Sequence, residues 1–331
     1  MLRAVRIGTL VPALVPALGV LLAGLVGLAL PAAVAAHGEP IPAPDAGAVL
    51  AAWRPQPVVL LGLTLALVGY LLLVRRVDAA HPATRVPRRR IAAWLAGLAA
   101  VAAALLSPLE AFAGVLFSAH MVQHLLLTMV APPLLALGAP VTLLLRWARP
   151  GLRRGVLLPL LHSRPVRAIS FPPVAWLVFA VVMWASHFSP LFEAALEDEL
   201  AHGLEHGLYL ISGLLFWWPV VGTDPVPWRM GAAARVGYLL LAMPQSAFLG
   251  LAIYSAPAPL YAHYALLERA WGPPALVDQQ IAGGLMWGAG DLLIVGPLLL
   301  AVAAWFRHEE EKGRRLDARL DRERALRENS R

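Results

Sequence analysis

The segment 57–74, PVVLLGLTLALVGYLLLV, contains no charged side chain in eighteen residues. A helix needs about 20 mostly apolar residues to cross the hydrocarbon core of a bilayer. The segment therefore predicts a transmembrane helix, and six further apolar segments follow it. These run over 91–113, 115–145, 172–190, 200–222, 233–256 and 281–306. We predict an all-α protein, a polytopic membrane helix bundle of seven transmembrane helices.

The segment 115–145 is too long for one straight membrane helix. Proline lacks the backbone N–H that a helix interior needs, and its ring clashes with the preceding turn. Pro132, Pro133 and Pro140 are therefore expected to break or kink the helix. The stretch toward Leu145 would then be re-entrant or interfacial.

The composition supports a membrane protein and argues against several other classes. Of the 331 residues, 59% are hydrophobic and only 14% are charged, whereas soluble domains are about half apolar and a quarter charged. Cysteine is absent, which excludes disulfides, thiolate metal sites and a cysteine nucleophile. The net charge of +7 does not predict nucleic-acid binding, because the basic residues lie where membrane topology requires them.

The distribution of basic residues predicts the orientation in the membrane. Of the 27 lysines and arginines, 23 lie on one predicted side, in 75–90, 146–167, 223–235 and 307–331. The alternate loops contain only Arg54 and Arg269. Cytoplasmic loops are enriched in lysine and arginine. We therefore predict an outer N-terminal segment at 37–56, a transmembrane domain at 57–306 and a charged cytoplasmic tail at 307–331.

The N-terminal segment 1–36 has two interpretations. Arg3 and Arg6 precede a long apolar run that ends in PAAVAAHGEP, and the AVA at 33–35 fits a signal-peptidase site. The segment is either a cleaved signal peptide or an extra N-terminal hydrophobic helix. Cleavage directly before His37 would leave an amine and an imidazole that could chelate copper together.

Seven of the ten histidines fall on the predicted outer side, and four of them form two HxxxH pairs. Residues four apart share one face of a helix, and imidazole is a common ligand of copper and zinc. Brought together, two pairs on different helices could offer four nitrogens to one ion. We therefore predict a metal site at the outer face, with ligands from His120, His124, His187, His202 and His206.

Weaker candidate ligands lie near these histidines in the sequence or in the predicted topology. They are Met121, Met183, Met286, His37 and His263. Thioether sulfur favours Cu(I), and structural zinc sites usually use cysteine. A set of histidines and methionines without cysteine therefore favours copper as the bound metal.

Four polar residues could support the site. Glu205 lies between His202 and His206 and could orient an imidazole as a hydrogen-bond acceptor. Asp291 lies well inside the seventh segment, and a carboxylate within a membrane is a functional hypothesis by default. Its candidate partners are Gln123, Gln245 and a histidine of the third segment.

A structural interpretation of the histidines stays open at this point. Histidines near lipid headgroups also act as amphipathic anchors or as hydrogen-bond donors between helices. The HxxxH spacing is a weak motif by itself, and the HExxH form of a zinc protease is absent.

Four ordered blocks resemble the CtaG family, the multi-span bacterial assembly factors of cytochrome c oxidase. They are FSAHMVQHLLLTMVAPPLLALGAP (117–140), HFSPLFEAAL (187–196), HGLEHGLYLISGLLFWWPVVG (202–222) and DQQIAGGLMWGAGD (278–291). The resemblance implies a multi-pass protein of the bacterial plasma membrane that serves the respiratory chain without being an enzyme. It implies a metallochaperone role, delivering copper to haem-copper oxidase subunits, with a periplasmic copper donor as a further partner.

Two other functions compete with copper delivery. Histidines on different helices could be the axial ligands of a haem in a membrane redox protein. A transporter would instead place its site near the middle of the membrane, centred on Asp291.

Overall fold

The computed structural model describes residues 46–225 and 227–329. The segment 1–36 and His37 lie outside the described residues. Every regular element of the described part is helical. The principal elements are α2 (Ala46–Ala51), α3 (Pro57–Ala80), α4 (Arg88–Leu105), α5 (Pro108–Ala113), α6 (Phe117–Leu125), the π-helical turn η3 (Leu126–Val130), α7 (Ala131–Leu137), α8 (Pro140–Trp147), α9 (Pro150–Leu152), η4 (Arg153–Leu157), α10 (Leu158–Leu161), α11 (Arg164–Ile169), α12 (Pro172–His187), α13 (Pro190–Glu197), α14 (Glu199–Val221), α15 (Ala232–Tyr254), α16 (Ala262–Leu266), α17 (Ala275–Gly284), the π-helical turn η5 (Leu285–Ala289) and α18 (Gly290–Asn329).

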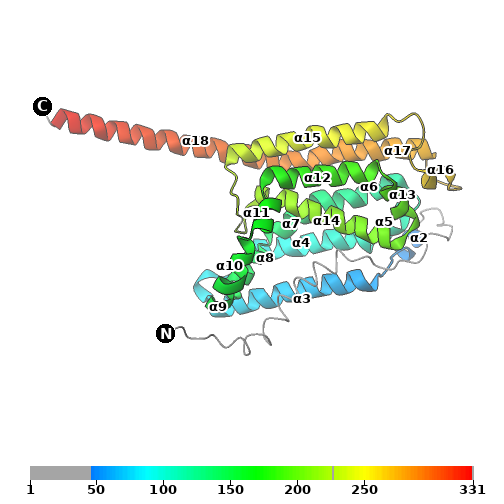
Figure 1. Cartoon of the computed structure of the whole chain (residues 1–331), viewed down its shortest axis with the longest axis horizontal. Coiled ribbons are helices and arrows are strands. Elements are labelled where there is room, and N and C mark those ends of the chain that lie inside the picture. Colours follow the sequence, from blue (N-terminus) through cyan, green and yellow to red (C-terminus); the bar gives the residue numbers. More distant parts are fainter. Residues whose placement is uncertain (1–45, 226, 330–331) are drawn as a thin grey trace.

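The long helices run side by side and form a bundle with two distinct ends (Figure 1). The short helices α5, α13 and α16 lie at one end, which we call the α13 end. The helices α8 to α11 lie at the other end, from which α18 extends far beyond the bundle. Within the bundle α4 packs on α7, α14 packs on α7 and α12, and α15 packs on α17 and α18.

Five helical segments of the described residues are long and apolar enough to cross a membrane. They are Pro57–Ala80, Phe117–Trp147, Glu199–Val221, Ala232–Tyr254 and Ala275–Leu326. A sixth results if α12 and α13, which meet at a bend of 68°, count as one span. The chain is therefore an all-helical membrane protein with five to six candidate spans. The predicted span 91–113 is not among them, and α4, which covers most of it, begins with three arginines. Seven spans and the orientation stay predictions.

The prolines of the third segment lie at its irregular positions. The π-helical turn η3 ends immediately before α7, in which Pro132 is in the first turn. Pro140 begins α8, directly after Ala139, whose φ of 52° is in the left-handed region. That conformation is costly for a residue with a Cβ atom, and it separates α8 from the helix before it.

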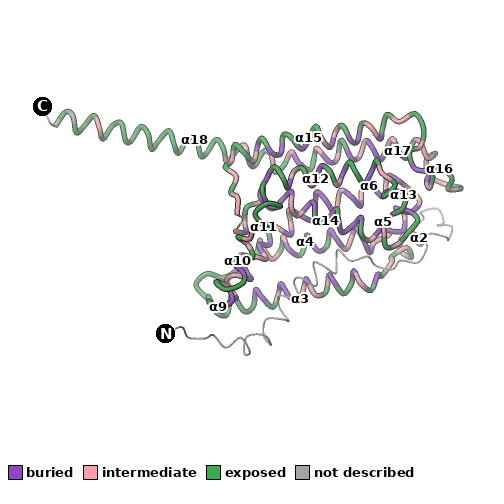
Figure 2. Tube along the Cα trace, viewed as in Figure 1, coloured by how far each residue is buried: buried purple, intermediate pink, exposed green. Residues whose placement is uncertain are grey.

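Exposed residues lie along the outer faces of the bundle (Figure 2), and many of them are large hydrophobic residues. Leu61 of α3, Leu241 of α15 and Leu300 of α18 are exposed by 59%, 66% and 72%. Large contiguous apolar surfaces are unusual on soluble monomers, so these faces fit contact with lipid. Beyond the bundle α18 becomes polar and exposed, and ion pairs such as Arg314–Glu310 run along it. The charged tail at 307–331 therefore continues the last membrane helix as far as Asn329.

Candidate metal centre

Two helices present titratable side chains on their buried faces at the α13 end. On α14 the buried residues His202, Glu205, His206 and Tyr209 follow the spacing i, i+3, i+4, i+7. This spacing lines one face of an α-helix. On α6 the pair His120/His124 is buried in the same way. The four-residue spacing thus puts each pair on a face that points into the protein.

The first group of candidate ligands joins α6 to α14. His120 and His124 face Glu205, whose Oε2 lies 3.6 Å from Nε2 of His120 and 3.9 Å from Nε2 of His124. One ligand atom from each of the three residues lies within 4.8 Å of the others. We call His120, His124 and Glu205 triad A.

The second group joins α14 to α5. Nε2 of His202 lies 3.4 Å from Oε1 of Glu110, and ligand atoms of Glu110, His202 and His206 lie within 4.8 Å of one another. The amides of Gln56 and Gln123 both donate hydrogen bonds to the Glu110 carboxylate. We call Glu110, His202 and His206 triad B.

The two triads are adjacent. The ring centroids of His120 and His202 are 5.8 Å apart, and those of His124 and His206 are 6.4 Å apart. His187, at the end of α12, lies 5.8 Å from His124 by the same measure. The structure therefore brings all five predicted histidines into one buried cluster, which is 6% exposed or less at each ring.

Hydrogen bonds from neighbouring groups orient two of the rings. The Tyr264 hydroxyl donates to the Ala113 carbonyl at 2.7 Å, so Nδ1 of His120, 3.1 Å from that hydroxyl, must be the donor to it. In a neutral ring the lone pair is then on Nε2, the atom that faces Glu205. Similarly, Nδ1 of His187 donates to the Met183 carbonyl at 2.7 Å, which leaves a lone pair on its Nε2. This pattern is typical of histidines that bind metals through Nε2.

A buried aspartate fixes the start of α6. Asp278 of α17 accepts hydrogen bonds from the backbone N–H of Phe117 at 2.7 Å, the backbone N–H of Ser118 at 3.3 Å and the Ser118 hydroxyl at 2.5 Å. Helix N-termini have unpaired N–H groups and a partial positive charge. Asp278 therefore caps α6 from another helix and holds His120, two residues further along, in position.

The helix α17 also packs closely against α15 at two glycines. A Cβ atom on Gly283 would lie only 2.6 Å from the Gly250 carbonyl oxygen, so this close approach requires glycine.

Aromatic side chains cover the cluster at the α13 end. Phe192 of α13 is fully buried and its ring centroid lies 5.0 Å from His120 and 5.4 Å from His187. It stacks on Tyr261 at 4.2 Å. A metal ion that reaches the histidines from this end must therefore pass the layer formed by Phe192 and Tyr261.

Several weaker sequence predictions have other roles in the structure. Nε2 of His263 is hydrogen bonded to the Gly114 carbonyl at 2.9 Å, and the ring belongs to neither triad. Gln123, one of three candidate partners of Asp291, donates through its amide to the Ala104 carbonyl and to Glu110. Gln245 lines a cavity with His124, in which Asp291 takes no part. Glu205, which was predicted to orient an imidazole, faces the two histidines of α6.

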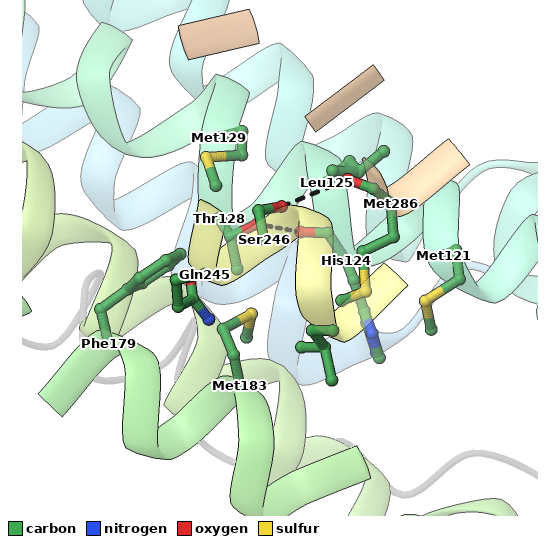
Figure 3. A pocket seen from close by; sticks show the side chains of 11 residues that line it. Met121, His124, Leu125, Thr128, Met129, Phe179, Met183, Gln245, Ser246 and Met286 are labelled. Atoms are coloured by element: carbon green, nitrogen blue, oxygen red, sulfur yellow. Dashed lines mark hydrogen bonds between the residues drawn. The ribbon is translucent and has the colours of Figure 1, made fainter. Parts of the chain in front are cut away.

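The predicted methionines lie together in a small cavity beside His124. Met121, Met183 and Met286 line it together with Met129, which the sequence analysis missed (Figure 3). Glu110 was also missed, although a glutamate inside the apolar segment 91–113 is as unusual as Asp291 in its segment. The signal that singled out Asp291 would have found Glu110. Met129 has no such signal, because methionine is an ordinary core residue.

The fold and the buried cluster of histidines and glutamates together place the chain among all-helical membrane proteins with a candidate metal centre. Over residues 68–308 the chain matches the family described as cytochrome c oxidase caa3 assembly factor (Caa3_CtaG). The chain therefore belongs to the Caa3_CtaG family of cytochrome c oxidase assembly factors. All six members of the two triads lie inside the matched residues.

Mycobacterial proteins of undetermined function are also similar to the chain. "Uncharacterized protein Mb0105" of Mycobacterium bovis is 32% identical over 289 residues, which is 84% of this chain and 43% of the relative. "Uncharacterized protein ML1998" of Mycobacterium leprae is 31% identical over 243 residues, 71% of this chain and 37% of the relative. The chain thus spans about two fifths of the length of these relatives. No solved structure matches the chain significantly.

Proposed function

We propose that this assembly factor binds copper at triads A and B, one ion in each, and passes it to a cytochrome c oxidase in the bacterial plasma membrane. One observation carries the proposal. Two sets of two histidines and one glutamate, all buried, each hold their ligand atoms within 4.8 Å. Copper is the cargo here, and we assign the protein no catalytic role.

The charge of the centre supports a cation as its occupant. Oε2 of Glu205 is buried and accepts no hydrogen bond from the described residues, although two imidazole nitrogens lie 3.6 and 3.9 Å away. A buried carboxylate oxygen that accepts no hydrogen bond is costly. In the tautomer set by Tyr264, His120 presents a lone pair to this oxygen, which is repulsive. A cation between the two atoms would remove both penalties.

The ligand types favour copper among the common ions. Imidazole suits zinc, copper, iron and nickel, and for a given set of nitrogen and oxygen ligands Cu²⁺ is the most tightly bound divalent ion of the first transition series. Three protein ligands leave at least one coordination position for another molecule, as in other open metal sites. A site from which an ion must be passed on needs such a position, because the acceptor can bind before the last protein ligand leaves.

The position of the centre suits exchange at one membrane surface. The loops at the opposite end of the bundle carry the excess of arginine, so the positive-inside rule assigns the α13 end to the outer face. Phe192 and Tyr261 lie next to the histidines at that end. A periplasmic copper donor and an oxidase subunit could therefore reach the centre from the same side, provided that α13 moves.

The two competing functions have less support. The cavity beside His124 has a volume of about 20 Å³, which is far too small for a haem. Asp291 is half-buried and belongs to neither triad, so nothing links a transport site there to the histidines.

Copper delivery can be tested in a host that lacks the gene and makes the oxidase. The host is complemented with wild-type protein, with His120→Ala/His124→Ala or with His202→Ala/His206→Ala, and the copper and haem contents of the purified oxidase are measured. We expect the paired variants to yield oxidase that contains haem but lacks copper. His308→Ala, which removes an exposed histidine of α18, should restore the wild-type copper content. Normal copper in the oxidase with both paired variants present in the membrane would contradict the proposal.

A further inference from the structure

We propose that a second, Cu(I)-selective subsite lies next to the triads, in the cavity lined by Met121, Met129, Met183 and Met286, with His124 as the ligand shared with triad A. This inference rests on the proposed copper function and adds a soft-metal site to it. The cavity lies on the side of His124 that points toward the middle of the bundle, since Met129 and Phe179 lie further from the α13 end.

Methionines are gathered at this place. The chain has seven methionines, and four of them line this one cavity (Figure 3). Each of the four is no more than 6% exposed. They come from α6, η3, α12 and η5, so segments far apart in the sequence converge here. The cavity volume of about 20 Å³ is enough for one water-sized sphere and therefore for one metal ion.

Two π-helical turns border the cavity. Met129 belongs to η3, and Met286 belongs to η5. Single π-helical turns inside α-helices are rare and occur frequently at functional sites. Each turn adds a residue to the helix and so changes the direction of the side chains beside it. Here both turns present a thioether to the same space, which ordinary core packing does not require.

The polar groups of the cavity leave a neutral set of soft ligands. The hydroxyl of Thr128 donates to the His124 carbonyl at 2.6 Å, and that of Ser246 donates to the Met286 carbonyl at 3.3 Å. Both hydroxyl protons are thus used by the backbone. Neither ring nitrogen of His124, a residue 2% exposed, has a hydrogen-bond partner anywhere in 46–225 or 227–329. What remains for an ion is thioether sulfur, imidazole nitrogen and the side-chain amide of Gln245, all of them neutral.

The charge of the ligands selects the charge of the ion. None of the described side chains that line the cavity is a carboxylate, whereas each triad contains one. The energy of burying an ion in a medium of low dielectric constant grows with the square of its charge. A neutral pocket therefore favours a monovalent ion over a divalent one, and thioethers select Cu(I) among the available metals. The triads, with their carboxylates, suit the divalent ion better.

His124 connects the two sites. Its Nε2 lies 3.9 Å from Glu205 in triad A, and the same residue lines the methionine cavity. An imidazole that belongs to both ligand sets allows a Cu(I) ion to move from one to the other without leaving the protein and without a change of oxidation state. The alternative is that the four methionines only fill an irregular gap in the core, and the two explanations predict different results on metal binding.

The test compares two sets of conservative substitutions in purified protein. The pocket variant is Met121→Leu/Met129→Leu/Met183→Leu/Met286→Leu, and the matched control is Met230→Leu/Met243→Leu, which changes two methionines outside the cavity. Exchange of methionine for leucine nearly conserves volume, so both proteins should fold, and thermal unfolding checks this. Cu(I) affinity is measured anaerobically by competition with a chromogenic chelator, and the ligand atoms of bound Cu(I) by X-ray absorption at the copper edge.

We expect sulfur ligands around Cu(I) in the wild type and in the control variant. The pocket variant should lose the sulfur signal, and its Cu(I) affinity should fall by more than the roughly tenfold effect of losing an outer-shell partner, with unchanged Cu(II) binding. Only nitrogen and oxygen ligands in the wild type, or unchanged Cu(I) affinity in the pocket variant, would overturn the subsite. In those cases loss of Cu(II) from the histidine variants would still support the proposed function, so the two failures are distinguishable.

Discussion

Asp278 and Glu205 are two fully buried carboxylates that contact the same helix, α6, and their surroundings differ completely. Asp278 accepts three hydrogen bonds from the first turn of α6 and lies 3.7 Å from Nη1 of Arg269. Glu205 accepts one hydrogen bond, from Tyr209 at 3.3 Å, through Oε1. Its Oε2 faces His120 and His124 and accepts none from the described part of the chain.

The difference separates a structural carboxylate from a functional one. Buried polar groups in native proteins are nearly always hydrogen bonded, and the exceptions need an explanation. Asp278 is satisfied by the protein alone and holds α6 in place. For Glu205 we propose that a cation bound between its Oε2 and the imidazoles supplies the missing interaction.

The largest effect on stability is expected for Asp278→Ala. The substitution leaves two backbone N–H groups of α6 without their buried acceptor and the Arg269 guanidinium without its carboxylate partner. Removing one partner of a buried, hydrogen-bonded ion pair costs about 3–5 kcal/mol. Thermal unfolding of the metal-free protein in detergent measures the loss. An unfolding midpoint equal to that of the wild type would show that Asp278 does not hold α6.

Glu205→Gln should lower metal affinity and leave the stability of the metal-free protein unchanged or higher. The amide keeps the shape of the side chain and can still accept the hydrogen bond from Tyr209, so the metal-free protein should be as stable as the wild type or more stable. Metal affinity at triad A should fall by at least the roughly 10- to 100-fold seen when groups around a metal site are removed. Cu(II) titration of the purified variant gives the affinity. A marked loss of stability with unchanged Cu(II) binding would assign Glu205 to the structural class.

Glu110→Gln should lower both stability and Cu(II) affinity, and so lies between Asp278→Ala and Glu205→Gln in its effects. Glu110 accepts hydrogen bonds from Gln56 and Gln123 and also faces His202. We expect Cu(II) affinity at triad B to fall about tenfold and the metal-free protein to lose about 1 kcal/mol, because one amide donor loses its acceptor. The same two measurements apply. If only stability changes, triad B is not a metal site.

The smallest effect is expected for Asp224→Asn, a capping carboxylate at the other end of the bundle. Asp224 accepts hydrogen bonds from the backbone N–H groups of Val141 and Thr142 and from the Thr142 hydroxyl. Burial raises its pKa, while these hydrogen bonds from α8 act in the opposite direction. Asparagine keeps one acceptor oxygen, so we expect a loss of about 1 kcal/mol. Cu(II) binding should not change, and any change would mean that the two ends are coupled.

The sequence predicted the helices and the faces that matter, because both depend on local spacing. Apolar segments predicted the membrane helices, and the spacing of His120/His124 and of His202/His206 predicted two shared faces. The positions of Pro132 and Pro140 predicted breaks in the third segment, and the structure has a π-helical turn and a left-handed residue next to them.

The partners across helices could not be predicted in this way. Glu205 is close in sequence to His202 and His206 but faces His120 and His124, because the choice depends on which helix packs against α14. Gln123 bonds to Glu110 on α5 and not to Asp291 for the same reason. The cavity formed by Met129 and three other methionines depends on contacts among four segments, and local spacing contains no information about them.

The number of Cu(II) ions bound by purified protein shows whether triads A and B are separate metal sites. We predict two ions in the wild type, one in His120→Ala/His124→Ala, one in His202→Ala/His206→Ala, and none in the variant that combines all four substitutions. Loss of all copper from either paired variant would mean that the four imidazoles hold a single shared ion. Retention of the wild-type amount in the fourfold variant would contradict the account, because the histidines would then not be the copper ligands.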